Sequence, residues 1–492
     1  MTDRHKEPLG RVRTKIVATL GPASRDPQTL RALVEAGVDV FRLNFSHGTH
    51  EEHSATLRDA RAAAEACGRV VAVLQDLGGP KIRLGPITGD AVECPVGEEF
   101  TLVTDRTSDD PRQLTCTYRY LPNDLKAGDE VFFADGAVAM TVTGAGGGVA
   151  RLSVTLAGRV RTHQGLNLPG AALNVQALTD KDLNDLDWTA ANPVDYVGLS
   201  FVRRAADVTR LRQELKNRGI TARIVAKIEK PQAVDDLDAI IAETDAAMVA
   251  RGDLGVEMDV ARVPAIQKRI IAACHEARVP VITATQMLNS METSNRPTRA
   301  EASDVFNAVL DGTDAVMLSG ETAVGQYPVE AVSTMSRIVT EAENLLFADP
   351  KAPWPAEGSR ASRPAPGQAG WVLPITEAVV EAVRLMARRL DAKLVLVGTK
   401  SGRTALALSK QRYAPPTLAL TDDSAVARAM ALYWGVTPLV RAQVADHQAN
   451  GDFVREWASA HGLVARGDHI LVVQGTTPNR PGHNAVLVQE VE

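Results

Sequence analysis

The chain alternates between short β-branched runs and longer stretches in which apolar side chains recur every three or four positions. Stretches such as residues 27–37, 206–219 and 263–277 have this helical spacing. The runs between them are short enough for strands, and we count eight, the number that a closed parallel β/α barrel requires. The runs cover residues 15–20, 38–45, 70–77, 195–201, 223–229, 246–252, 279–285 and 314–321.

The pattern also predicts how the chain divides into domains. The alternation stops after the third run, and residues 79–169 contain strand-like segments with Gly-rich turns, which predicts an inserted all-β lid domain. Residues 348–371 are rich in Pro, Ala, Gly and Ser and predict a linker. Residues 372–492 predict a separate α/β domain with a doubly wound sheet. The predicted fold class is therefore α/β, with a (β/α)₈ TIM barrel built from residues 1–78 and 170–347.

Composition and charge narrow the functions that the chain can have. A chain of 492 residues is too long for one hydrophobic core and is expected to form several domains. Its content of 45% hydrophobic and 23% charged residues is typical of a soluble globular protein. A net charge of -6 gives no basis for binding nucleic acid or a membrane surface. The N-terminus lacks the apolar core of a signal peptide, and we expect a cytoplasmic protein. The widely spaced cysteines predict neither a disulfide framework nor a metal site; they are Cys67, Cys94, Cys116 and Cys274.

The run RIVAKIEK, residues 223–230, carries two charged side chains within an apolar strand pattern. Lys227 and Glu229 are two positions apart, so on a strand they point to the same face. Burial of an unpaired charge is costly. This pair therefore needs a salt-bridge partner, a metal ion or a ligand.

Polar residues gather at the carboxyl ends of the predicted strands. The active sites of β/α barrels lie on that face, so we expect a ring of polar groups around one barrel mouth. The members of the ring are Arg42, Asn44, Asp76, Lys227, Glu229, Arg251, Asp253, Thr285, Ser319 and Glu321.

Two carboxylates in this ring are candidate metal ligands. Glu229 and Asp253 end consecutive strands and have no His or Cys nearby, which favours Mg²⁺ or Mn²⁺. Lys227 beside them is suited to stabilise an oxyanion or a phosphoryl group in transfer. A purely structural ring of salt bridges is the alternative interpretation.

Five longer motifs resemble pyruvate kinase, and the order of the domains matches that family over nearly the whole chain. The resemblance implies transfer of a phosphoryl group from phosphoenolpyruvate to ADP, giving pyruvate and ATP in glycolysis. It also implies a homotetramer. The motifs are VFRLNFSHG (40–48), MVARGDLGVEM (248–258), VPVITATQMLNSM (279–291), RPTRAE (296–301) and DVFNAVLDGTDAVMLSGETAVGQYP (304–328).

The resemblance implies a role for each residue that handles phosphoenolpyruvate. Glu229 and Asp253 are the metal ligands, and Lys227 stabilises the phosphoryl group and the enolate. Arg42 binds the phosphate. The backbone N–H groups of Gly252 and its two neighbours receive the carboxylate if they open a helix.

Further roles follow from the same resemblance. Thr285, with Ser319 and a water molecule, delivers the proton to the enolate, and Glu321 belongs to that relay. Taken singly, Thr285 is also compatible with an ordinary strand threonine, and Arg42 with an ion pair in the core. The nucleotide contacts are His47, Arg83 and Arg204.

One motif departs from the family pattern. Many members read DTKGPEIR and bind potassium there, whereas this chain reads DLGGPKIR at residues 76–83. Leu77 cannot coordinate a cation, and the ammonium group of Lys81 repels one. We expect the potassium-independent branch, with Lys81 supplying the positive charge. The other equivalents of the potassium site are Asn44, Ser46 and Asp76.

The segment VLVGTKSGRTALALSK, residues 395–410, reads as a strand, a hydroxyl-rich loop and a helix. Such a loop predicts an anion site, with ordinary helix capping as the alternative. Pyruvate kinases bind a phosphorylated effector in this loop, so the resemblance implies an allosteric site. A sugar diphosphate, a sugar monophosphate and AMP all carry the required group. The site residues are Thr399, Ser401, Arg403 and Thr404.

Two other functions compete with phosphoryl transfer. A Mg²⁺-dependent lyase or aldolase that acts on a pyruvate enolate would use similar carboxylates, but it leaves the lid and the TKSGRT loop unexplained. A non-catalytic sugar phosphate sensor would be expected to have lost part of the catalytic set. That set is retained here: Lys227, Glu229, Asp253 and Thr285.

Overall fold

The computed structural model describes most of the chain. The described residues are 12–104, 107–134, 136–169, 176–348, 364–368, 370–442, 447–476 and 482–492. The linker expected at residues 348–371 lies largely outside them.

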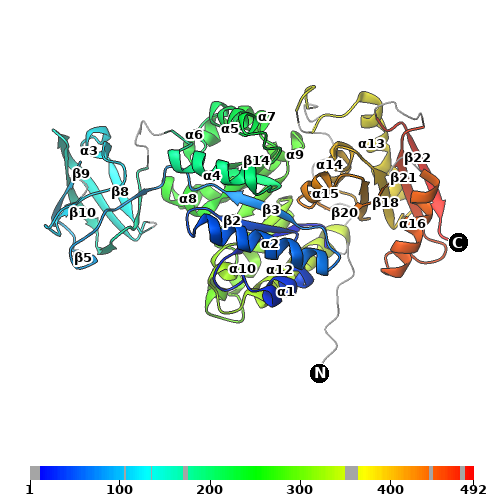
Figure 1. The fold of residues 1–492 in the computed structure, drawn as a ribbon, viewed down its shortest axis with the longest axis horizontal. Coiled ribbons are helices and arrows are strands. Elements are labelled where there is room, and N and C mark those ends of the chain that lie inside the picture. Colours follow the sequence, from blue (N-terminus) through cyan, green and yellow to red (C-terminus); the bar gives the residue numbers. More distant parts are fainter. Residues whose placement is uncertain are drawn as a thin grey trace.

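Eight parallel strands close into the barrel that the sequence predicts (Figure 1). Their order around the barrel, β1-β17-β16-β15-β14-β13-β3-β2, follows the chain once the insertion after β3 is passed over. The strands are β1 (Lys15–Leu20), β2 (Val40–Asn44), β3 (Ala72–Asp76), β13 (Tyr196–Leu199), β14 (Arg223–Ile228), β15 (Ala246–Ala250), β16 (Val281–Ala284) and β17 (Ala315–Leu318).

Two of the predicted runs continue past their strands into a helix. The run 246–252 ends as a strand at Ala250, because the chain turns into the helix α8 (Arg251–Glu257). The run 314–321 ends at Leu318, before the short helix α11 (Gly320–Ala323). Gly252 and Gly320 stand at these turns. Apolar content alone does not mark where a strand yields to a helix.

Helices surround the barrel, and side-chain caps fix where several of them begin. Asp26 accepts hydrogen bonds from the first turn of α1, and Thr179 forms a capping box with Asp182 in α4. The principal helices are α1 (Pro27–Ala36), α2 (His50–Ala66), α4 (Asp180–Ala191), α5 (Ala205–Asn217), α6 (Pro231–Asp235), α7 (Leu237–Glu243), α9 (Val263–Glu276), α10 (Arg299–Leu310) and α12 (Pro328–Ala348).

The insertion between β3 and α4 forms an all-β lid with its own core, at the left of Figure 1. A seven-stranded sheet has the order β4-β12-β8-β9-β10-β6-β7, and β11 pairs with β5. Phe100, Val131 and Phe133 are among its buried residues. The strands are β4 (Ile82–Arg83), β5 (Ala91–Cys94), β6 (Glu99–Val103), β7 (Gln113–Leu114), β8 (Glu130–Phe133), β9 (Val138–Gly146), β10 (Val149–Leu156), β11 (Gly158–Arg161) and β12 (Gly165–Asn167), with helix α3 (Leu121–Asp124).

The C-terminal domain is an α/β sheet with the order β20-β19-β18-β21-β22. The chain order reverses at β18, and apolar clusters cover both faces, as a doubly wound sheet requires. The edge strand β22, which the sequence pattern does not predict, pairs antiparallel with β21. The elements are β18 (Leu394–Gly398), β19 (Thr417–Thr421), β20 (Val436–Val440), β21 (His469–Gln474), β22 (Ala485–Glu490), α13 (Pro374–Arg389), α14 (Arg403–Ser409), α15 (Ser424–Met430) and α16 (His447–Ala460).

This domain closes the barrel at the end opposite the lid. Ala429 and Leu432 join the apolar cluster inside the barrel, which includes Val17 and Val225. The hydroxyl of Tyr196, at the start of β13, donates to the backbone oxygen of Ala429. The open mouth therefore lies at the carboxyl ends of the strands. Among the described helices, none is long and apolar enough to cross a membrane.

Candidate active site

Arg42 is held inside the barrel mouth by two neighbouring strands. Its Nε and Nη2 atoms lie 2.7 and 2.6 Å from Oδ2 of Asp76, at the end of β3. Its Nη1 atom donates to the Thr19 hydroxyl at 3.0 Å. Because Arg42 and Asp76 are buried, these two contacts to one carboxylate oxygen and the bond to Thr19 fix the direction of the guanidinium group.

Lys227 and Glu229 point into the same mouth and partner one another. The Lys227 Nζ atom lies 2.8 Å from Glu229 Oε1 and 3.4 Å from Asp76 Oδ1. It also donates to the Ser200 hydroxyl at 2.8 Å. The Phe201 backbone N–H donates to Glu229 Oε2 at 2.7 Å. The charged pair at the carboxyl end of β14 is therefore fully partnered.

The charges of this cluster shift one another's ionisation. Burial by itself would lower the pKa of Lys227, but Asp76 and Glu229 raise that pKa above its usual value. Burial by itself would raise the pKa of Asp76, but Lys227 and Arg42 lower it. Burial raises the pKa of Glu229; Lys227 opposes the rise and the Asp253 carboxylate adds to it. Three carboxylates thus face two cations, an excess of negative charge that a metal cation would offset.

Thr285 has a strained backbone at the end of β16. Its φ of +70° is unusual for a β-branched residue. Its hydroxyl donates to the oxygen of Ala284 at 2.7 Å and accepts from the N–H of Gly252 at 2.8 Å. A Cβ atom on Gly252 would lie 3.3 Å from that hydroxyl. The Nη2 atom of Arg251 donates to the backbone oxygen of Thr285 at 2.7 Å. Thr285 is therefore not an ordinary strand threonine, because its backbone conformation is unusual and is held by these contacts.

Ser319 and Glu321 form the next part of the mouth. The Ser319 N–H donates to Glu321 Oε2 at 2.7 Å, and the Leu288 N–H donates to Oε1 at 3.0 Å. Glu321 is 1% exposed, and this burial raises its pKa. The carboxylate therefore joins the loop after β17 to the loop after β16.

The predicted nucleotide contacts lie around the rim. His47 lies on the surface after β2. Partial desolvation of its ring lowers its pKa, as do the charges of Arg83, Lys81 and Arg42. Arg83 lies on the first lid strand and donates to the backbone oxygen of His163. Arg204 is exposed at the start of α5.

The equivalents of the potassium site lie at the carboxyl ends of β2 and β3 and on the segment that leads from β3 into the lid. The Ser46 N–H donates to the side-chain oxygen of Asn44 at 3.2 Å, which forms an Asx turn. Leu77 is buried, and its backbone oxygen accepts from the Ser200 hydroxyl. Lys81 extends along Gly165 of the lid strand β12.

The residues predicted to bind an effector lie at the carboxyl end of β18. The Thr399 hydroxyl accepts from the N–H of Gly402, which has a φ of +77°. The Thr404 hydroxyl is 3.0 Å from the His483 ring. Ser401 and Arg403 are exposed.

The sequence matches two family models in the order of these domains. "Pyruvate kinase, barrel domain" matches residues 11–332, and "Pyruvate kinase, alpha/beta domain" matches residues 377–488. The chain belongs to the pyruvate kinase family. The activity of pyruvate kinase is transfer of a phosphoryl group from phosphoenolpyruvate to ADP, so neither the lyase nor the sensor alternative is needed.

Curated pyruvate kinases are similar over nearly the whole chain. The enzyme of Mycobacterium tuberculosis is 41% identical over 480 residues, which are 96% of this chain and 97% of that enzyme. Pyruvate kinase 2 of Synechocystis is 40% identical over 489 residues, 98% of this chain and 80% of its own. A crystal structure of a pyruvate kinase from Cryptosporidium parvum superposes with a TM-score of 0.87 at 33% identity, covering 98% of this chain and 97% of that one.

Pyruvate kinases generally need a divalent metal, and the donor set here fits one. Mg²⁺ is bound by one or two carboxylates, with water and substrate phosphate completing its shell. Glu229 and Asp253 are two such carboxylates in a cluster with excess negative charge. Within the described residues, no group of three or more His, Cys, Asp or Glu residues has the arrangement of a metal cage. A site with only two carboxylate ligands leaves coordination positions open for water and for substrate phosphate.

Sequence reasoning missed three groups that complete the pyruvate kinase site. Ser200 bonds to Lys227, Thr19 bonds to Arg42, and the Phe201 N–H bonds to Glu229. Ser200 and Thr19 lie near the carboxyl ends of their strands, so the rule that found the other residues applies to them. The Phe201 contact is made by the backbone, which side-chain patterns do not reveal.

Proposed function

We propose that phosphoryl transfer takes place at the mouth formed by Arg42, Asp76, Lys227 and Glu229. The observation that carries this proposal is the buried cluster in which the Lys227 ammonium group contacts both carboxylates. A positive group held by its neighbours needs no reorganisation when negative charge develops on the substrate. Lys227 stabilises the phosphoryl group in transfer and the enolate that remains. Arg42 binds the phosphate.

Glu229 and Asp253 hold the divalent metal, Mg²⁺ or Mn²⁺. When bound, the metal neutralises phosphate charge and orients the substrate. The substrate carboxylate binds beside the start of α8, where the Gly252 N–H bonds to the Thr285 hydroxyl.

Thr285 and Ser319 serve the proton step. The enolate carbon needs a proton to become pyruvate, and a hydroxyl backed by water is a suitable donor. The strained backbone of Thr285 supports this role, because strain often marks a functional position. Glu321 positions Ser319 through the N–H bond described above.

His47, Arg83 and Arg204 contact the nucleotide. All three lie toward the rim rather than in the buried cluster, which suits a second substrate that enters after the first. The pKa of His47 is lowered in part by the charge of Arg83, and this supports a shared positive environment for the ADP phosphates.

The decisive experiment measures pyruvate release from phosphoenolpyruvate and ADP with Mg²⁺. Activity that is lost in Lys227→Met and retained when an exposed lysine such as Lys216 is replaced by Met would support the proposal. Full activity of Lys227→Met would overturn the role given to Lys227.

The enzyme belongs to the potassium-independent branch. Asp76 already has two cations in contact, Arg42 and Lys227, so its charge is offset within the chain. Leu77 offers no hydroxyl, and Lys81 contributes a further positive charge near the lid. Asn44 and Ser46 then serve the Asx turn rather than a monovalent ion.

Activity assays without potassium or sodium test this proposal. We expect the unmodified enzyme to keep most of its activity, and the double variant Leu77→Thr, Lys81→Glu to gain potassium activation. Lys126→Glu, a charge reversal elsewhere on the lid, is the matched control and should not gain it. Loss of nearly all activity of the unmodified enzyme without potassium would overturn the proposal.

A phosphorylated effector binds at Thr399, Ser401, Arg403 and Thr404. These residues follow β18, where the sheet order reverses, and ligands of doubly wound sheets bind at such switch points. Ser401 and Arg403 also line a cavity of about 560 Å³ between the C-terminal domain and the barrel.

Titration with fructose bisphosphate, glucose 6-phosphate and AMP, with activity as the readout, tests the effector site. We expect at least one to activate, and Arg403→Ala to abolish that response. Arg466→Ala is the control, because Arg466 is exposed before β21 at the other end of the sheet. No response to any of the three compounds would overturn this part of the proposal.

The protein assembles as a homotetramer. The exposed apolar residues Ile375 and Leu385 on α13, which are 54% and 55% exposed, support contact with another copy. Sedimentation of the purified protein tests the proposal, and a monomer across micromolar concentrations would overturn it.

A further inference from the structure

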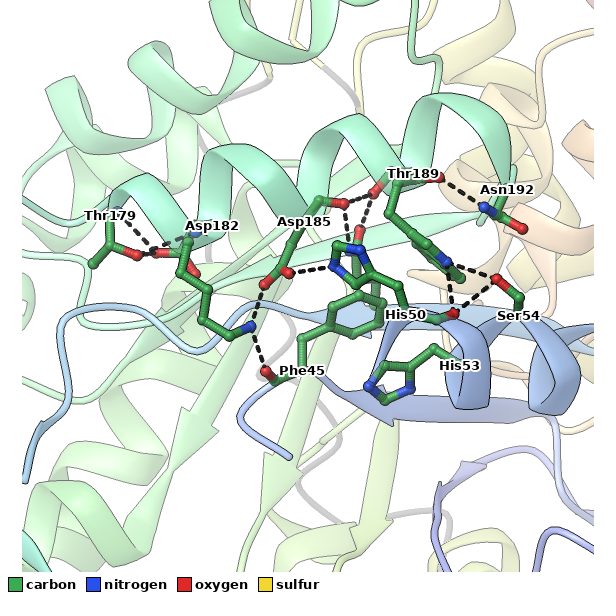
Figure 2. A network of polar contacts seen from close by, with 12 residues as sticks. Phe45, His50, His53, Ser54, Thr179, Asp182, Asp185, Thr189 and Asn192 are labelled. Carbon is green, nitrogen blue, oxygen red and sulfur yellow. Dashed lines mark hydrogen bonds and ion pairs between the residues drawn. The ribbon is translucent and has the colours of Figure 1, made fainter. Parts of the chain in front are cut away.

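The first turn of α4 contains a carboxylate that bonds to both connections between the lid and the barrel. Asp182 is 0% exposed. Its Oδ2 atom accepts from the N–H and the hydroxyl of Thr179, at 2.8 and 2.7 Å, where the chain returns from the lid. Its Oδ1 atom accepts from the N–H of Gly79 at 3.1 Å, where the chain leaves for the lid. Figure 2 shows Thr179 and Asp182 together at the start of the helix.

Gly79 packs closely against Ser200, the residue whose hydroxyl contacts Lys227. Its φ is +63°, and a Cβ atom there would lie 2.9 Å from the Cβ of Ser200. The Ser200 hydroxyl accepts from Lys227 Nζ and donates to the oxygen of Leu77. A shift of Gly79 would therefore displace the residue that contacts Lys227.

The helix that carries Asp182 is anchored to the barrel along its length. Lys181 Nζ donates to the oxygen of Phe45 at 2.8 Å and lies 2.6 Å from Asp185 Oδ2. Asp185 Oδ1 lies 2.8 Å from the His50 ring (Figure 2). The Trp188 indole N–H donates to the Ser54 hydroxyl. α4 is thus fixed to the loop and helix that follow β2.

We propose that Asp182 is a positioning residue for phosphoryl transfer, because it clamps both lid connections and so fixes the lid relative to Lys227. No ion pair of Asp182 occurs within the described part of the chain, and its charge is stabilised instead by N–H donors and the helix N-terminus. The effect on the nucleotide rests on the proposed contact of Arg83, which lies four residues beyond Gly79 on the lid.

Asp182→Asn tests the clamp with almost no change in shape. The amide keeps one acceptor oxygen, so its NH₂ group must face either Gly79 or Thr179, both of which donate. We expect kcat to fall about tenfold and the KM for ADP to rise, because the lid is no longer held in one orientation. The KM for phosphoenolpyruvate should stay within about twofold, since that site lies on the barrel. Hydrogen exchange at the Gly79 N–H should be about tenfold faster.

Asp26→Ala is the matched control. Asp26 also caps a barrel helix with its carboxylate, but its bonds stay within α1. It should lower the melting temperature without changing kcat, the KM for ADP or exchange at Gly79. A purely structural role for Asp182 would give the same pattern as this control, and that result would overturn the proposal.

If Asp182→Asn does not fold, hydrogen exchange at the Gly79 N–H of the unmodified enzyme still tests the proposal. A Gly79 N–H bonded to a buried carboxylate should exchange slowly, and exchange at the rate of an unstructured peptide would overturn the clamp. Arg83→Ala separates the two proposals. If Arg83→Ala leaves the KM for ADP unchanged, the proposed nucleotide contact of Arg83 is wrong. The proposal for Asp182 is then still tested by hydrogen exchange at the Gly79 N–H and by the kcat of Asp182→Asn.

Discussion

Arg412 of the C-terminal domain lies against Asp314 of the barrel, with Nη2 2.8 Å from Oδ1 and both side chains 1% exposed. Lys410 Nζ contacts the other carboxylate oxygen at 2.6 Å. One buried anion thus receives two cations across the domain boundary. Lys410 directly follows α14, the helix that begins in the proposed effector loop, so the loop is linked to the barrel through one rigid element.

Asp314→Asn should destabilise the protein strongly. The change keeps the shape but leaves two buried cations without their anion, and breaking such pairs costs about 3–5 kcal/mol. The free energy of unfolding in urea measures the effect. Asp391→Asn is the control, because it breaks a solvent-exposed pair with Lys393 and should change stability by less than about 1 kcal/mol. Equal effects of the two variants would contradict the prediction.

The free energy of unfolding should decrease as the pH falls, because His275 is buried near the same domain boundary. Burial lowers the pKa of His275 well below its usual value, and Arg412, Lys410, Arg278 and Arg384 lower it further. The folded state therefore keeps this ring neutral, while the unfolded chain binds a proton below a pH of about 6.5. The free energy of unfolding then decreases as the pH falls below that value, by at most about 1.4 kcal/mol per pH unit.

His275→Gln measures this contribution, since glutamine does not titrate. Urea unfolding at several pH values between 8 and 5 should show a shallower loss of stability in the variant. Parallel curves for the two proteins would show that His275 does not titrate on unfolding.

Lys227→Met should reduce kcat by at least about 10²–10³-fold, the typical effect of removing one preorganised electrostatic group. Arg42 still neutralises Asp76 in this variant, which favours a folded barrel. Circular dichroism and the melting temperature check that the fold persists. A kcat within tenfold of the unmodified enzyme would mean that Lys227 serves the fold rather than the reaction.

Glu229→Gln should weaken the binding of Mn²⁺ by at least about tenfold, because even partners outside the ligand shell have effects of that size. Electron paramagnetic resonance of free Mn²⁺ gives the affinity without reference to activity. Glu257→Gln is the control, since Glu257 is a buried carboxylate that pairs with Lys230 instead. Unchanged affinity in Glu229→Gln would exclude Glu229 as a ligand.

The sequence by itself determined the eight-stranded barrel, the lid, the C-terminal sheet and the residues at the strand ends, because strand period and chain order are local properties. It also showed that Lys227 and Glu229 share a face. It did not reveal that Asp76 joins Arg42 to Lys227, that Thr285 is strained, or that Asp182 reaches Gly79. The contacts of Asp76 and Asp182 join residues that are far apart along the chain, and Thr285 is held by Arg251 and Gly252. Only the packing of strands, loops and helices around the barrel mouth brings these groups within hydrogen-bonding distance, and this is why the tertiary structure alone decided them.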